Sequence, residues 1–438
     1  MENLSILPYL SLSFSFGLLS LLTPCVFPLI PITVSYFTKR QELEKAKPIL
    51  DAFLYSFGII LSFTVVGFLI ALLFGASGVN RLAANPYINL IIAGIFILFA
   101  FNLFGMFEII VSSNVLTRLS NFHSNNNLLS IWAMAFTFTL TTFTCTMPFI
   151  GTVLVSASKG DWFYPIIGML GYSFAFSIPF FLLALFPSTI KKLPRSGNWM
   201  VSFKIILGFL ELAAALKFIS NADLVFGWGV LSREFFLVIW ASLFIGASFY
   251  LFGVFYFTHE KKEEAKSALR IFFGIVFLSI ALNFLTATNG RSLGELDAYL
   301  PPPSNQMSNI KSQEELVWLD NLEIAKKESL KTGKRIFIDF TGYTCTNCRW
   351  MEQNIFPETD VKELLSRFIL VRLYTDGEEK IHEDNQKYEE DKFGTIALPL
   401  YVGMDAEEKV LGQFLGMTRD KEEYKKFLKG LLDLTPMF

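Results

Sequence analysis

Long apolar segments limit the folds open to this chain more than any other feature. A helix needs about 20 apolar residues to cross the hydrocarbon core of a bilayer. Segments close to or above that length lie at 8–38, 49–74, 88–110, 128–157, 162–187, 201–220, 235–257 and 271–288. The chain is 53% hydrophobic and 17% charged, which excludes an ordinary soluble globular protein. The sequence therefore predicts a polytopic α-helical membrane domain of about eight spans.

Basic residues in the connecting segments set the expected orientation. Most follow odd-numbered spans, in 39–48, 111–127, 188–200 and 258–270. The even-numbered connections hold only Arg81, Lys159, Arg233 and Arg291. Because Lys and Arg accumulate on the cytoplasmic side, we expect the N-terminus and everything after residue 288 on the opposite side. The start of the chain lacks the basic residues of a cleaved signal peptide, so we expect it to belong to the first span.

The chain changes character after the last apolar segment. We predict a transmembrane domain at 1–288, a Pro/Ser/Asn linker at 289–311 and a soluble domain at 312–438. Helical and strand patterns in the soluble domain indicate an α/β fold. We expect helices at 314–333, after Cys348 and at 420–434, and strands at 335–341, 368–375, 398–404 and 409–416. The acidic run "DGEEKIHED" predicts a solvated loop, with client docking as the alternative.

Two short stretches of the membrane domain match each other. "CVFP" at Cys25–Pro28 corresponds to "CTMP" at Cys145–Pro148. Further matches occur at 55–57 and 172–174, and at Gly94 and Gly208. An odd number of spans per copy makes the copies antiparallel, so these matches predict an inverted repeat of spans 1–3 and 4–6. Chance is the alternative, since the motif is short.

Prolines surround the two membrane cysteines. Pro24, Pro28 and Pro31 flank Cys25, and Pro148 follows the second cysteine. Proline breaks a helix, and broken helices are tolerated at membrane depth where they line a cavity. The first and fourth segments are therefore expected to be broken helices. We expect the prolines to shape an opening through which buried thiols meet proteins, the alternative being kinks that serve packing alone.

The strongest chemical motif is "IFIDFTGYTCTNCRWME". A predicted strand ends and Cys345-Thr346-Asn347-Cys348 opens a helix. The free N–H groups and dipole of a helix N-terminus lower a thiol pKa, so Cys345 is expected to attack a disulfide and Cys348 to resolve the mixed disulfide. A zinc site is the alternative, but zinc usually takes four ligands and no second pair lies nearby. We expect no metal and no cofactor besides redox-active disulfides.

Two residues are predicted to support this disulfide. Asp339 lies six residues before Cys345 on the strand, where a buried carboxyl can relay the proton of the resolving thiol. An ordinary strand-end Asp facing water is the alternative. Pro399 precedes the strand of "IALPLYV", and a cis peptide there would expose the Leu398 backbone for pairing with a substrate.

The residues together carry a family resemblance. The soluble domain, with Asp339, Cys345, Cys348 and Pro399 in this order, is similar to thioredoxin. The whole of 8–438 resembles the DsbD family of transmembrane thiol:disulfide interchange proteins, in "TPCVFPLIPI", "FTCTMPF" and "DFTGYTCTNCRWME". Many members begin with an extra immunoglobulin-like domain, for which we expect no room before residue 8.

The resemblance implies an electron relay in the bacterial inner membrane. Cytosolic thioredoxin would reduce a Cys25–Cys145 disulfide, and this pair would reduce Cys345–Cys348 in the periplasm. That pair would reduce periplasmic thioredoxin-fold proteins, such as disulfide isomerases or cytochrome c maturation factors, or a separate protein resembling the missing domain. Partners would also include membrane lipid. The net charge of −2 shows no basic excess and we find no nucleic-acid signature.

Other functions remain as alternatives. A solute or metal carrier with a tethered, regulating thioredoxin domain would also fit an inverted repeat, and the spans could be a passive anchor. Neither needs a matched pair of membrane cysteines.

Polar residues within spans indicate a functional site by default. Glu211 is a candidate of unknown role, and Lys204, Lys217 and Asn102 are weaker ones because the lysines lie near span ends.

Overall fold

The structure is a computed structural model of the whole chain. It describes residues 6–23, 26, 33, 36–37, 48–106, 131–142, 146, 163–185, 198–256, 268–302 and 316–433. These residues divide into two compact units. One comprises 1–79, 94–212 and 247–274, and the other 80–93, 213–246 and 275–438.

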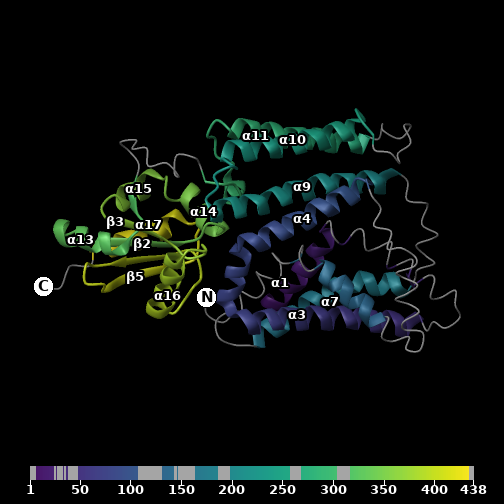
Figure 1. Cartoon of the computed structure of the whole chain (residues 1–438), viewed down its shortest axis with the longest axis horizontal. Helices are drawn as coiled ribbons and strands as arrows, with labels where there is room; N and C mark the ends of the chain where they lie inside the picture. Colours follow the sequence, from purple (N-terminus) through teal and green to yellow (C-terminus); the bar gives the residue numbers. More distant parts are fainter. Residues whose placement is uncertain are drawn as a thin grey trace. The chain divides into compact units, whose positions relative to one another are not determined.

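Apolar helices build the membrane domain (Figure 1). They are α1 (Ile6–Leu19), α3 (Pro48–Ala84), α4 (Pro86–Leu103), α7 (Phe163–Leu185), α9 (Asn198–Phe226), α10 (Arg233–Phe252) and α11 (Ala268–Ala287), with the 3-10 helix η1 (Ser20–Leu22) and a helical stretch at 131–142. By length and composition alone, four helical stretches among the described residues could cross a membrane: 49–69, 86–103, 233–252 and 268–287. Shorter apolar helices lie at 8–19, 131–142 and 166–182 within the described residues. Each predicted apolar segment thus contains a helix, and the number of spans stays a prediction.

Proline explains two features of these helices. α3 ends at Ala84 and α4 begins at Pro86, with Asn85 between them. The residue before a proline is disfavoured in helical conformation, and proline itself suits the first turn of a helix. Pro179 lies inside α7, where it removes one backbone donor from the helix ladder.

Small residues bring α1 and α7 into close contact in the first unit. A Cβ added to Gly17 would lie 2.3 Å from the carbonyl oxygen of Tyr172 and 2.9 Å from the Cβ of Ala175. Because lipid tails are as apolar as helix side chains, helices in membranes associate through such close packing. Glycine at position 17 is therefore required by the helix–helix distance.

Aromatic side chains form the core of the same unit. Tyr55, Phe63, Phe138, Tyr172 and Phe176 are buried in one cluster. Their rings meet mostly edge to face, as for Phe63 and Tyr172, whose centroids lie 5.9 Å apart. This geometry matches the positive edge of one ring with the negative face of another. Residues 55 and 172, which correspond in the proposed repeat, thus lie in one core.

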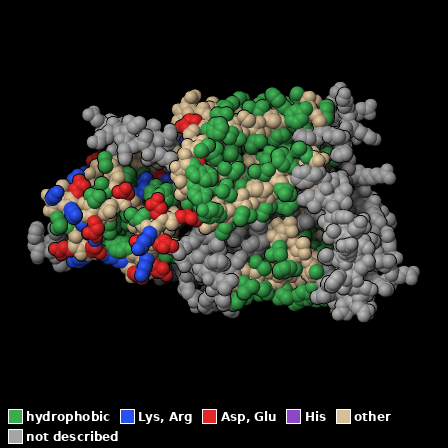
Figure 2. Space-filling view, in the orientation of Figure 1, with side chains coloured by type: hydrophobic (Ala, Val, Ile, Leu, Met, Phe, Trp, Pro, Cys, Tyr) green, Lys and Arg blue, Asp and Glu red, His purple; other side chains and the backbone are tan. Residues whose placement is uncertain are grey.

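The membrane domain and the C-terminal domain differ in the side chains on their surfaces. On the face drawn in Figure 2, hydrophobic side chains cover the apolar helices, and Lys, Arg, Asp and Glu gather over the C-terminal domain. α11 is the clearest case, because its apolar window is only 17% buried. An apolar helix with so much exposed surface is suited to a lipid environment.

The C-terminal domain is a five-stranded mixed sheet with helices on both faces (Figure 1). The strands are β1 (Trp318–Leu319), β2 (Ile336–Thr341), β3 (Ile369–Tyr374), β4 (Leu400–Met404) and β5 (Val410–Leu415), in spatial order β1-β3-β2-β4-β5. β2 is parallel to β3 and antiparallel to β4. The helices are α13 (Leu322–Thr332), α14 (Thr346–Asn354), α15 (Thr359–Leu365), α16 (Lys380–Phe393) and α17 (Lys421–Asp433).

Alternation along β2 divides the domain into two layers. Ile336, Ile338 and Phe340 pack in the cluster that includes α13 and α16. Phe337 packs in the opposite cluster with α14, α15 and α17. Because successive strand residues point to opposite faces, Asp339 lies on the face of Phe337, which α14 covers. This register places a carboxyl beneath the helix that carries both cysteines.

Two expectations for the soluble domain need correction. The acidic run is not simply a loop, because α16 begins at Lys380 within it. The predicted helix at 314–333 is too long at its start, because Trp318–Leu319 pairs with β3 as β1 and α13 begins at Leu322. Asn321 caps α13 by accepting the N–H groups of Glu323 and Ile324, which favours a start at this point. The predicted linker also contains an ordered 3-10 helix, η3 (Gly294–Tyr299).

The close approach at Gly17 gives a direct test. Gly17→Ala is expected to lower stability by about 1–3 kcal/mol, because the added methyl overpacks the α1–α7 contact. Gly94→Ala is the matched control, since a Cβ there meets nothing within 4 Å and alanine favours a helix. Thermal unfolding in detergent would measure both. An equal midpoint for Gly17→Ala and the unaltered chain would contradict the tight contact.

Candidate redox site

A disulfide joins Cys345 and Cys348 at the start of α14. Cys345 is the N-cap residue of the helix, and its Sγ accepts the backbone N–H of Cys348 at 3.1 Å. Cys348 is 1% exposed, whereas Cys345 is only partly buried. A partner sulfur can therefore reach Cys345 but not Cys348. The geometry suits attack at the first cysteine and resolution by the second, because exchange requires sulfur–sulfur contact.

Asp376 holds the turn that leads into the disulfide. Its carboxylate accepts the N–H of Tyr343 at 2.7 Å and both the N–H and the hydroxyl of Thr344 at 3.0 and 3.1 Å. A Cβ on Gly342 would lie 2.6 Å from the same carboxylate. Since unpaired backbone donors are costly when shielded from water, Asp376 stabilises one conformation of the turn. It comes from the segment after β3 and was not among the predicted residues.

A layer of charge lies beneath the disulfide on the α14 face of the sheet. Arg372 of β3 donates from Nε to Asp339 Oδ2 at 3.2 Å, and its NH2 nitrogen lies 3.8 Å from Glu352 Oε1. Arg349 of α14 donates to Glu352 Oε2 at 2.6 Å and to the Gly342 carbonyl at 3.0 Å. Asp339, Arg349 and Glu352 are all buried. The two carboxyl groups and the two guanidinium groups thus balance each other's charge where solvent screening is weak.

The protonation of Asp339 follows from this setting. Burial raises the pKa of Asp339 to about 7, with the Arg372 guanidinium opposing the rise and the Glu352 carboxylate adding to it. Its Oδ1 atom has no hydrogen-bond partner among the described residues. A carboxyl that exchanges a proton near neutral pH is suited to general acid–base work. The alternative of a water-facing Asp does not describe this site.

Aromatic residues form the side of the site next to the turn. Tyr343 stacks on Tyr374 with ring centroids 4.1 Å apart, and its hydroxyl lies 3.4 Å from His382 Nε2. Burial raises the pKa of Tyr343 to about 12, so its hydroxyl stays neutral at physiological pH. His382 lies on α16, not in a loop as the sequence suggested.

Leu398 and Pro399 lie beside the same turn. The Leu398–Pro399 peptide bond is cis, and a Cβ on Gly342 would lie 3.1 Å from the Leu398 Cδ1 atom. Pro399 precedes β4, and its carbonyl accepts the N–H of Gly416. The structure therefore brings Asp339, Cys345, Cys348 and the Leu398–Pro399 segment to one end of the sheet.

The membrane cysteines lie outside the described residues. Cys25, Cys145, Pro24, Pro28, Pro31 and Pro148 all belong to this group. Their described neighbours Val26 and Thr146 are buried. The Tyr172 hydroxyl donates to Ser20 Oγ at 2.7 Å and is also hydrogen-bonded to Thr146. One buried tyrosine therefore connects residues close in sequence to each cysteine.

Comparisons with known proteins address the two domains separately. Residues 6–222 match the family described as the cytochrome C biogenesis protein transmembrane domain, and residues 317–406 match a thioredoxin-like family. The chain belongs to the DsbD family. A cytochrome C biogenesis transmembrane domain followed by a thioredoxin-like domain with a CxxC disulfide is the combination that the sequence predicted.

Individual relatives agree with this assignment. The thiol:disulfide interchange protein DsbD of Vibrio cholerae serotype O1 is 27% identical over 374 residues, which cover 83% of this chain and 57% of the relative. DsbD of Salmonella typhi is 28% identical over 80% of this chain and 58% of the relative. DsbD of Campylobacter jejuni is 26% identical over 82% of this chain and 60% of the relative. The chain thus spans less than two thirds of the length of these DsbD relatives.

Sequence reasoning missed several residues of this DsbD-family site. Glu352 and Arg349 follow the second cysteine within two turns, so helical spacing could have placed one of them under the disulfide. No local sequence pattern marks Arg372 or Asp376 as a residue of the site. They reach the site only because β3 lies beside β2 in the register that pairs Asp339 with Arg372.

The buried carboxyl predicts a pH dependence. The pKa of Asp339 is about 7 in the folded chain against an ordinary 3.8. The native state therefore keeps a proton that the unfolded chain releases, and this group's contribution to stability falls as the pH rises from about 4 to 7. Infrared titration of the carboxyl band is expected to show a midpoint near 7 that Asp339→Asn removes.

Arg372→Gln tests whether the guanidinium lowers the pKa of Asp339 in the same infrared titration. Loss of the guanidinium is expected to move the Asp339 midpoint to higher pH, because the cation favours the ionised form. Arg367→Gln is the control, since Arg367 is exposed, lies just past the end of α15 and pairs with Glu363 of that helix. A midpoint unchanged or lowered by Arg372→Gln would show that Arg372 does not set this pKa.

Proposed function

We propose that this chain carries reducing equivalents across the bacterial inner membrane to proteins of the periplasm. Electrons pass from cytosolic thioredoxin to the Cys25–Cys145 pair, then to Cys345–Cys348 and on to periplasmic disulfides. The observation that carries the proposal is a partly accessible CxxC disulfide over a buried acid, in a chain whose membrane domain holds two cysteine–proline segments. The DsbD relatives are named thiol:disulfide interchange proteins, which supports this reaction.

Exchange at the C-terminal site proceeds in two steps. The Cys345 thiolate attacks a client disulfide, forming a mixed disulfide and releasing one client sulfur as thiolate. Cys348 then loses its proton and attacks the Cys345 sulfur, which forms Cys345–Cys348 and releases the reduced client. Asp339 accepts the Cys348 proton in this proposal, since its pKa near 7 makes it a suitable base. Two electrons leave the chain in each cycle, and the membrane pair returns them.

The membrane step needs two cysteines in contact. A disulfide requires Cα atoms about 6 Å apart, so Cys25 and Cys145 must approach each other across the two proposed repeats. The hydrogen bonds of Tyr172 to Ser20 and Thr146 support such an approach. Pro24, Pro28, Pro31 and Pro148 break the helices beside the thiols and open a path for proteins from either side.

Partners and orientation follow from the direction of transfer. The basic connecting segments face the cytoplasm, where thioredoxin is the donor. The N-terminus and the domain at 312–438 face the periplasm, with 289–311 as the connection. Disulfide isomerases and cytochrome c maturation factors are the acceptors we propose, either directly or through a separate protein that supplies an immunoglobulin-like domain.

Cys25→Ser tests the relay. Without a membrane disulfide, electrons cannot reach the C-terminal pair, so Cys345–Cys348 is expected to accumulate in the oxidised form in growing cells. Trapping free thiols with a maleimide reagent and separating the products by mass would measure the oxidised fraction. A solute carrier or a passive anchor with a redox domain predicts the same oxidised fraction as the unaltered chain, and that result would exclude the relay.

The same assay tests the prolines. Replacing Pro28 and Pro148 together with alanine is expected to raise the oxidised fraction toward that of Cys25→Ser, because straight helices would close the path to the thiols. Pro179→Ala is the matched control, since Pro179 lies within α7 outside the cysteine segments. Normal transfer by the Pro28 and Pro148 double variant would leave these prolines a packing role only.

Cys348→Ser identifies the acceptors. The variant lacks the resolving thiol, so clients are expected to stay attached to Cys345 as mixed disulfides that reductant releases. Peptide mass spectrometry of the released proteins would name them. A variant carrying both Cys345→Ser and Cys348→Ser is the control and should capture nothing. Capture of cytosolic proteins alone would reverse the proposed orientation.

A further inference from the structure

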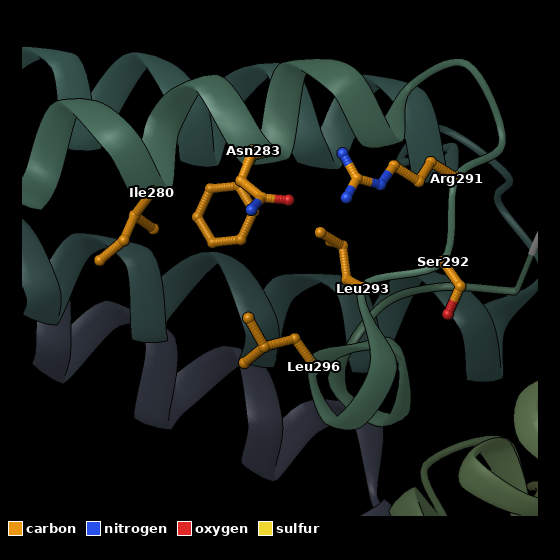
Figure 3. A pocket seen from close by; sticks show the side chains of 7 residues that line it. Ile280, Asn283, Arg291, Ser292, Leu293 and Leu296 are labelled. Atoms are coloured by element: carbon orange, nitrogen blue, oxygen red, sulfur yellow. The ribbon is translucent and has the colours of Figure 1, made fainter.

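We propose that the carboxyl end of α11 binds one anionic phospholipid, with the lipid phosphate on Arg291. A pocket of about 280 Å³ opens there. It is lined by Ile280, Asn283, Phe284, Arg291, Ser292, Leu293 and Leu296 (Figure 3). One wall is the last turns of α11, and the other is the segment that returns after Gly290. Gly290 has a φ of +84°, a conformation that favours glycine and reverses the chain.

The returning wall is held by a buried carboxylate. Asp297 of η3 is 1% exposed. One of its oxygens accepts from Arg233 at the start of α10, and the other accepts from the Ser292 hydroxyl at 2.6 Å and the Leu293 N–H at 2.9 Å. Leu300, Phe284 and Ala287 are buried together in one apolar cluster next to this ion pair. The pocket is therefore a preformed feature of the fold.

The pocket opens on the apolar surface of α11. Leu282 is 54% exposed on the same helix, and Leu296 on the opposite wall is 42% exposed. Water does not favour such a surface, whereas acyl chains do. Arg291 and Ser292 line a polar edge of the pocket, a few residues past Ala287, the last residue of a helix long enough to span. Asn283, within that helix, also lines the pocket. This arrangement of an apolar floor and a polar edge matches the boundary between acyl chains and headgroups.

Arg291 supplies an uncompensated positive charge at that edge. It is exposed and makes no hydrogen bond or ion pair within the part of the chain that the structure describes. The two carboxylates nearest in sequence are occupied, because Asp297 binds Arg233 and Glu295 pairs with Arg419. In Figure 3 the Arg291 side chain runs back toward Asn283, over the pocket. An anion entering the pocket would therefore meet a guanidinium with all its donors available.

A phospholipid satisfies both halves of the site. A guanidinium binds two oxygens of a phosphate diester at once, and Asn283 adds a polar side chain to the lining. The glycerol esters and the first methylene groups would then lie on Ile280, Phe284 and Leu296. Free phosphate would use only the polar edge and leave the apolar floor exposed. We therefore commit to a lipid as the occupant, and its source is the surrounding bilayer.

Native mass spectrometry of the full-length chain tests the proposal. The protein would be purified in detergent, freed of co-purified lipid and titrated with phosphatidylglycerol. One lipid is expected to bind more tightly than the rest, and Arg291→Gln is expected to weaken that site about tenfold. Leu296→Asn is expected to weaken it as well, through the apolar floor. Arg367→Gln, at an exposed arginine of α15's C-terminal flank, is the matched control and should bind like the unaltered chain.

Two further probes separate the sources of binding. Diacylglycerol lacks the phosphate and inorganic phosphate lacks the acyl chains, so both are expected to bind at least about tenfold more weakly than phosphatidylglycerol. Phosphate binding as tight as lipid binding would show a free-anion site and overturn the proposal. Equal lipid binding by Arg291→Gln and the unaltered chain would also overturn it, because Arg291 would then not hold the phosphate. A thermal unfolding midpoint in detergent equal to that of the unaltered chain would confirm that each variant is folded.

Discussion

The buried ion network beneath the disulfide is the interaction on which the C-terminal site depends. Two carboxyls and two guanidiniums share a space between β2, β3 and α14 from which water is largely excluded. An unpaired charge there would cost several kcal/mol, so each member needs the others. Burial raises the pKa of Asp339 to about 7, and the Arg372 guanidinium opposes that rise. The pKa of this carboxyl thus follows from its burial and from the charges around it.

In the membrane domain, too, buried polar groups need partners, and hydrogen bonds rather than ion pairs supply them. Lipid offers no hydrogen bonds, so buried polar side chains must find partners within the protein. Tyr172, Ser20 and Thr146 satisfy one another, and the small residue Gly17 permits the close helix contact that brings them together. Polar groups near both cysteine segments are therefore tied into one core.

Near the end of the membrane domain, one buried ion pair and one unpaired arginine determine the chemistry of the surface. Asp297 is neutralised by Arg233 and fixes the segment after α11. Arg291, a few residues away, has no such partner within the described residues and lies on a pocket with an apolar floor. The contrast between a paired and an unpaired arginine gives the boundary region one structural ion pair and one site open to an anion.

The sequence by itself determined the features that rest on local chemistry and periodicity. Apolar segments long enough for a bilayer, the CxxC pair at a helix start and Asp339 on the preceding strand all follow from neighbouring residues. Helix α16 escaped prediction because its sequence is strongly charged and shows few apolar positions at helical spacing. Tertiary structure alone decided the roles of Arg372 and Asp376, which depend on the register of β3 against β2. The tertiary structure also creates the pocket at Arg291, because the chain reverses at Gly290 and brings together residues that no sequence periodicity relates. Contacts between strands and across turns are set by packing over the whole domain, and a linear pattern does not contain them.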